Sequence, residues 1–69
     1  MEQLYQALKG YSCLDYFSFD GEWLSFEYPG IEIRFTIRQY ADLFLVKVEG
    51  KEIFHNVEPL AIIEFIMDR

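Results

Sequence analysis

Three turn dipeptides interrupt the middle of this chain: Asp20-Gly21, Pro29-Gly30 and Glu49-Gly50. The runs between them are rich in aromatic and β-branched residues and alternate with a period of two, as half-buried strands do. Short loops of this kind connect neighbouring antiparallel strands. The spacing therefore predicts a meander of four or five antiparallel strands between about Leu14 and Ile53.

The alternation also predicts which residues share a face of the sheet. With two-residue loops, Phe19 faces Glu22 and Tyr28 faces Ile31. Both loops then place one apolar set on the same face, namely Phe17, Phe19, Leu24, Phe26, Ile31, Ile33, Phe35 and Ile37, and Phe44, Val46 and Val48 extend it. A bulge at Pro29-Gly30 would shift the pairs, because this dipeptide suits a type II turn better than a hairpin turn.

Helical spacing replaces this alternation at the two ends of the chain. Leu4, Ala7, Leu8 and Tyr11 predict a short first helix that stops at Gly10. A second helix is expected from Val57 to Asp68, with Asn56 as its cap and Pro59 in its first turn. We therefore expect a single α+β domain over residues 1–69: a short N-terminal helix, a four- or five-stranded antiparallel meander sheet, and a C-terminal helix packed on one face of the sheet.

The C-terminal helix is apolar around most of its circumference, whereas a helix on a sheet needs one apolar stripe. We expect its second buried side at Ile62, Ile66 and Met67. This seam packs either against the N-terminal helix or against a second copy of the chain in a homodimer.

Reactive residues are few. Cys13 is the one cysteine and His55 the one histidine, so the sequence offers neither an internal disulfide nor the ligands of a structural zinc site. Nucleophilic catalysis would need His55 beside a serine or cysteine, and the glycines are spread over separate turns instead of forming a phosphate loop. We expect no enzymatic activity, no metal site and no cofactor.

The charge balance is acidic. Twelve acidic residues against six Lys and Arg give a net charge of −6 at pH 7, too few cations for a surface that binds nucleic acid directly or a membrane. No signal peptide or membrane-spanning segment is recognisable, and with a lone thiol this predicts a cytoplasmic protein. The acidity either serves solubility or steers the chain toward a basic partner surface.

The sheet face opposite the apolar set has the composition of a contact surface. Its partner-binding candidates are Tyr16, Trp23, Arg34, Arg38, Leu43, Leu45 and Phe54. Trp, Tyr and Arg supply much of the binding energy at protein interfaces. The alternative is that Trp23 is covered within the chain, by an arginine stacked on its indole or by the N-terminal helix.

Three functions fit these expectations. The first is a non-enzymatic protein-binding module, a small inhibitor, adaptor or immunity-type protein of the kind that phages and mobile elements encode, whose protein partner has a basic surface. The second is an acidic nucleic-acid mimic that blocks a DNA- or RNA-binding protein. The third is a homodimeric structural protein.

Overall fold

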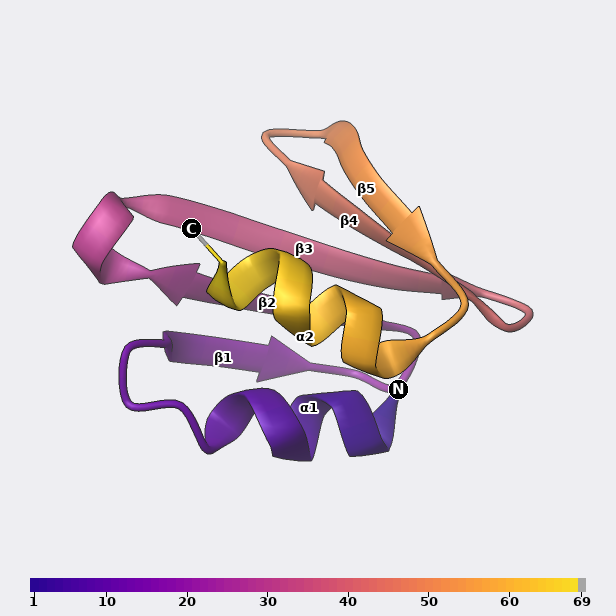
Figure 1. The fold of residues 1–69 in the computed structure, drawn as a ribbon, viewed down its shortest axis with the longest axis horizontal. Coiled ribbons are helices and arrows are strands. Elements are labelled where there is room, and N and C mark those ends of the chain that lie inside the picture. Colours follow the sequence, from indigo (N-terminus) through magenta and orange to yellow (C-terminus); the bar gives the residue numbers. More distant parts are fainter. Residues whose placement is uncertain (69) are drawn as a thin grey trace.

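A five-stranded antiparallel sheet with two helices on one of its sides forms the fold (Figure 1). The computed structural model describes residues 1–68. The elements follow in the order α1 (Glu2–Lys9), β1 (Asp15–Phe19), β2 (Trp23–Tyr28), β3 (Ile33–Tyr40), β4 (Leu43–Val48), β5 (Lys51–Asn56) and α2 (Pro59–Met67), with a 3₁₀ turn at Pro29–Ile31. The strands lie side by side in chain order, so the α+β fold with a meander sheet is confirmed.

The first two hairpins have longer loops than expected. Phe19 pairs with Leu24 and Tyr28 pairs with Ile33, each two residues away from the predicted partner. In the first loop the Asp20 carboxylate accepts hydrogen bonds from the backbone N–H groups of Glu22 and Trp23. In the second loop a 3₁₀ turn precedes Glu32, whose φ is 55°. A shift of two leaves the paired strand residues of these hairpins on their predicted faces, because side chains alternate with a period of two. Ile31 is the exception: it lies in the 3₁₀ turn and is 38% exposed, so its assignment to the apolar face is wrong.

The last two hairpins turn within two residues. Tyr40 pairs with Leu43, and Val48 pairs with Lys51 across Glu49-Gly50. Both residues of that second turn have positive φ, 53° and 80°, which is the conformation of a type I′ hairpin turn. β3 continues through Tyr40, so the connection to β4 consists of Ala41 and Asp42 alone.

The core lies between the sheet and the two helices. Its buried apolar residues are Leu4, Leu8, Leu14, Leu24, Phe26, Phe35, Ile37, Phe44, Val46, Ile62 and Ile66. Ile62 and Ile66 are fully buried within this one chain, so of the two alternatives for this seam they fit packing inside the chain and not a dimer contact. Met67 is half-buried against the same core.

The C-terminal helix starts two residues later than predicted, at Pro59. The Asn56 side chain accepts a hydrogen bond from the Glu58 backbone N–H at 2.9 Å, which forms a turn ahead of the helix instead of a cap on it. Val57, ahead of the helix, and Leu60, in its first turn, are exposed, at 49% and 67%.

A β-bulge corrects the position of Phe54. Val46 pairs with Phe54 while the next residue, Lys47, pairs with Glu52, so Ile53 is an extra residue in β5. From the bulge onward the strand presents the opposite set of side chains to each face. Phe54 therefore lies on the helix side, stacked on Phe65 with ring centroids 4.3 Å apart, and its assignment to the partner-binding face is wrong.

The other edge strand, β1, is also irregular. The pairing with β2 shifts between Asp15 and Ser18, and Tyr16 in this bulge has φ of 58°. Bulged edges are poor templates for a further strand. Both edges of this sheet are thus unsuited to strand addition, which leaves the sheet face as the better surface for contact.

Candidate protein-binding face

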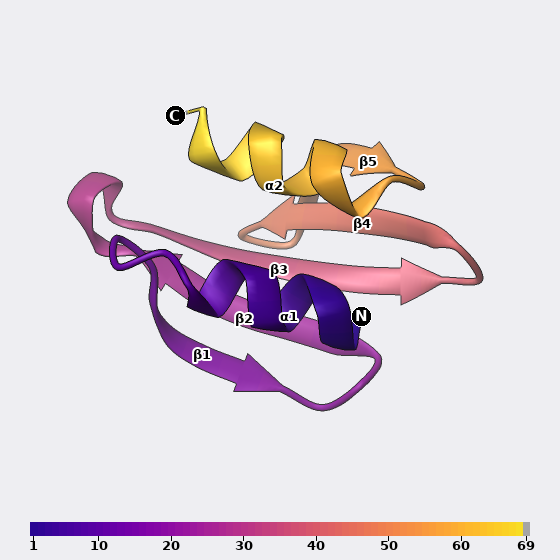
Figure 2. The same cartoon turned by 60° about the horizontal axis from the view of Figure 1, so that its bottom comes forward.

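One face of the sheet is not covered by any helix of residues 1–68. Figures 1 and 2 show α1 and α2 on the same side of the sheet. We call the other side the open face, and the register places on it Asp15, Ser18, Trp23, Ser25, Glu27, Arg34, Thr36, Arg38, Tyr40, Leu43, Leu45, Lys47, Glu52 and His55. The alternative in which the N-terminal helix covers Trp23 is therefore excluded, because Leu4 and Leu8 of α1 are buried in the core on the opposite side.

A row of large side chains crosses the open face at right angles to the strands. Trp23 on β2 is opposite Arg38 on β3, and Arg38 is opposite Leu45 on β4. We call these three residues the Trp23 row. Directly opposed residues on one face have Cβ atoms about 5 Å apart, so these three residues are neighbours across the strands. All three are half-buried, and Tyr40 and Leu43 form the neighbouring pair toward the end of the sheet.

A second row consists of small hydroxyl residues. Ser18, Ser25 and Thr36 are aligned across β1, β2 and β3 in the row next to Trp23 and Arg38. Ser25 is only 6% exposed although no helix lies above it, because its longer neighbours stand around it. The open face is therefore uneven, with the Trp23 row raised beside a lower strip of hydroxyl groups.

The charged groups of the open face are mostly paired. Arg34 binds Glu27 through a 3.0 Å contact from Nη1 to Oε2, and His55 Nδ1 lies 2.7 Å from Glu52 Oε2. Arg38 has neither an ion pair nor a side-chain hydrogen bond within residues 1–68, and Trp23 has no cation–π contact there. The donors of the Arg38 guanidinium thus remain available beside two apolar side chains.

The structure brings most of the predicted site residues together. Trp23, Arg34, Arg38, Leu43 and Leu45 share the open face. Tyr16 is 63% exposed but belongs to the bulge at the β1 edge. Tyr40 and His55 also lie on the open face and were not predicted as site residues. Tyr40 stands between the polar residues Gln39 and Asp42, which resemble a connection, and the predicted meander ends at Ile53, whereas β5 continues past His55 to Asn56.

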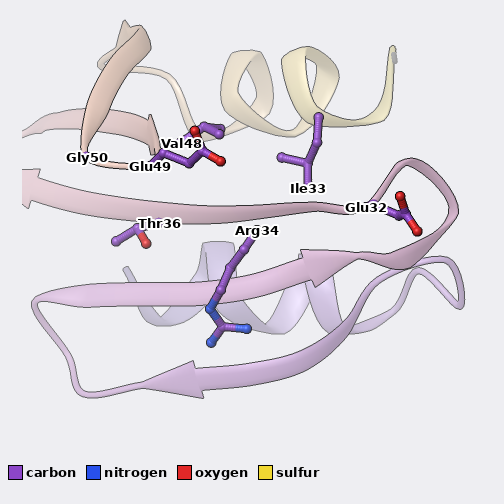
Figure 3. Close-up of a pocket in the computed structure, with 7 residues that line it drawn as sticks. All are labelled: Glu32, Ile33, Arg34, Thr36, Val48, Glu49 and Gly50. Carbon is purple, nitrogen blue, oxygen red and sulfur yellow. The ribbon is translucent and has the colours of Figure 1, made fainter.

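A shallow depression of about 420 Å³ opens where β3 extends beyond the end of β4 (Figure 3). It is lined by Glu32, Ile33, Arg34, Thr36, Val48, Glu49 and Gly50. Figure 3 shows Arg34 running across β2, consistent with its ion pair to Glu27, and the remaining charges at the rim are the carboxylates of Glu32 and Glu49. Two exposed carboxylates and an arginine that is already paired do not define a ligand site.

Within residues 1–68, the pair of His55 and Glu52 is the one arrangement that resembles catalytic machinery. A carboxylate that orients a histidine is two thirds of a nucleophilic triad. No serine, threonine or cysteine in residues 1–68 hydrogen-bonds to His55, and both side chains are substantially exposed, at 60% and 44%. Within the same residues no three His, Cys, Asp or Glu side chains gather as metal ligands would.

Cys13 lies at the end of the covered side, next to Tyr28. Hydrogen bonding to Cys13, followed by the negative charge of its thiolate, raises the pKa of the Tyr28 hydroxyl above its ordinary value. This contact is on the opposite side of the sheet from the Trp23 row, because Tyr28 has the same parity in β2 as Leu24 and Phe26.

Comparisons with known proteins identify no relative: no protein-family model, curated protein or solved structure matches the chain. No helix in residues 1–68 has the length and apolar character needed to cross a membrane.

Proposed function

We propose that this protein is a non-enzymatic protein-binding module, a small inhibitor, adaptor or immunity-type protein that docks its open face on a partner protein. The observation that supports this most is the Trp23 row on a face that no other element of residues 1–68 covers. Trp and Arg are the residue types most enriched at binding hot spots, and such hot spots sit at the centre of an interface.

The Trp23 row has the parts that an interface centre needs. Trp23 and Leu45 supply apolar area that a partner removes from water, and each buried Å² contributes about 25 cal/mol. Arg38 between them supplies hydrogen-bond donors without an internal acceptor to displace. A partner that places an apolar side chain and a carboxylate or carbonyl here satisfies all three residues together.

The other two functions have less support. A nucleic-acid mimic needs rows of carboxylates, whereas the open face carries as many cations as acids: Arg34, Arg38 and Lys47 against Asp15, Glu27 and Glu52. A homodimer through α2 loses its main contacts, because Ile62 and Ile66 are occupied in the core of their own chain.

Paired capture tests the proposal. Wild-type protein and the Trp23→Thr variant serve as baits on an extract of the cells that produce the protein, and the partner is the one that the wild type retains and the variant loses. Binding to the purified partner is then measured by calorimetry. We expect Trp23→Thr and Arg38→Thr each to raise Kd by about 30-fold or more, the effect of a hot-spot residue worth about 2 kcal/mol.

Lys51→Thr is the matched control. It removes one positive charge, as Arg38→Thr does, from an exposed strand position off the open face. We expect this variant to keep the wild-type Kd, and all variants to melt within a few degrees of the wild type. A partner that binds Trp23→Thr and Arg38→Thr as tightly as the wild type contradicts docking through this face.

A further inference from the structure

The acidic residues are distributed unevenly between the open face and its surroundings. Acids and cations balance on the face itself. Outside it, residues 1–68 hold two lysines, Lys9 and Lys51, against nine acids: Glu2, Asp20, Glu22, Glu32, Asp42, Glu49, Glu58, Glu64 and Asp68. Outside the open face, residues 1–68 therefore carry a net charge of −7, whereas the open face itself is neutral.

Every turn between two strands carries an exposed acid. Asp20 and Glu22 lie between β1 and β2, Glu32 lies between β2 and β3, Asp42 lies between β3 and β4, and Glu49 lies between β4 and β5. We call these five residues the turn acids. In a meander, alternate turns lie at opposite ends of the sheet, so the turn acids border the open face at both ends of its strands.

These two observations, together with the proposed function on which this step rests, specify the partner. We propose that the open face docks on a protein surface that has an apolar centre with one hydrogen-bond acceptor and Lys or Arg residues around it. The Trp23 row meets the centre of that surface, and the turn acids meet its basic rim. Opposite charges around an apolar centre increase the association rate and reject partners of the wrong sign.

A second copy of the chain is the wrong partner for the same reason. Two copies joined face to face around a two-fold axis would bring two sets of turn acids to the border of one interface. Like charges placed together across an interface oppose association. Docking on a basic protein and self-association through the open face are thus alternatives, and the charge distribution favours the first.

A displayed library of a small three-helix scaffold with a randomised surface tests this proposal without knowledge of the natural partner. Binders are selected on the wild-type protein and sorted by whether they still bind Trp23→Thr. We expect the binders that require Trp23 to carry an apolar centre and an excess of Lys and Arg among the randomised positions. Binders that require Trp23 but are neutral or acidic would overturn the basic partner and leave docking through the face intact, whereas an absence of Trp23-dependent binders overturns both.

Matched charge variants separate local complementarity from general attraction. The triple variant Glu22→Gln, Asp42→Asn, Glu49→Gln removes three turn acids, and Glu58→Gln, Glu64→Gln, Asp68→Asn removes three exposed acids at and around α2. Both raise the net charge equally. We expect the first to weaken Trp23-dependent binding about tenfold at low salt and the second about twofold or less. Equal effects of the two triples would overturn the assignment of the turn acids to the interface.

Discussion

The two faces of this sheet come from the same strands and have opposite properties. Leu24 and Ile37 point to the helix side and are fully buried, while their chain neighbours Trp23 and Arg38 point to the open face and remain half-exposed. On the covered side, α1 and α2 complete a core of aliphatic and aromatic residues. On the open side nothing in residues 1–68 completes the surface. The buried contacts that stabilise the fold thus lie on one face, and the apolar residues of the other face remain available for contact with a partner.

The sharpest way to test this division is to truncate neighbouring residues on opposite faces. Leu24→Ala removes a fully buried side chain, and such changes cost about 2–5 kcal/mol through lost burial and the cavity left behind. Small domains have little stability to lose, so we expect loss of most cooperative folding. Trp23→Thr should cost about 1 kcal/mol or less. Urea unfolding followed by circular dichroism measures both, and equal costs would contradict the division.

Phe54 tests the same division of roles, because strand alternation predicted it on the open face. The structure stacks it on Phe65 of α2. We expect Phe54→Ala to destabilise the protein by about 2 kcal/mol, less than a fully buried phenylalanine, and to leave partner affinity unchanged. Leu45→Ala is its counterpart on the open face, for which we expect weaker binding and a smaller loss of stability. If the Phe54→Ala variant binds the partner more weakly at a temperature where the variant is fully folded, Phe54 belongs to the docking surface.

The sequence predicted which face core strand residues such as Leu24 occupy, but not which residues pair across the strands. The face occupied by Leu24, Phe26 and Phe35 was predicted correctly even though the pairs were not, because a register error of two preserves the side on which each residue lies. The loop lengths depended on the Asp20 side chain and on a 3₁₀ turn at Pro29. The identity of a turn dipeptide such as Asp20-Gly21 does not specify these local hydrogen bonds, so it does not specify the loop length.

The candidate site was predicted where the strands are regular and missed where they are not. Trp23, Arg38 and Leu45 follow from alternation alone, whereas the extra residue Ile53 reversed the assignment of Phe54. A bulge adds one residue without a change in composition. Face assignments that are counted by alternation along the chain are therefore reversed after the bulge. The partner of the C-terminal helix could not be decided for another reason. The apolar pattern of a helix is the same whether its second side packs against its own chain or against a second copy.

The smallest expected effect concerns the end of the covered side, at Tyr28. Its phenol has a raised pKa because it is hydrogen-bonded to Cys13 and lies near the thiolate charge. We expect Cys13→Ala to lower the pKa of Tyr28 toward its ordinary value, and Cys13→Ser to have a smaller effect because the hydroxyl keeps a hydrogen-bond partner. Titration of the Tyr28 ring carbon by NMR resolves it from the four other tyrosines.

The sign of the accompanying stability change follows from the direction of the shift. The folded protein holds the Tyr28 proton more tightly than the unfolded chain does, so this contribution is present below the ordinary tyrosine pKa and is lost as pH rises through the raised one. The Cys13→Ala variant should lose less stability than the wild type across that alkaline window, while the Trp23 row, on the other side of the sheet, keeps its solvent exposure. A pKa of Tyr28 that is the same in wild type and variant would show that Cys13 does not act on the Tyr28 hydroxyl.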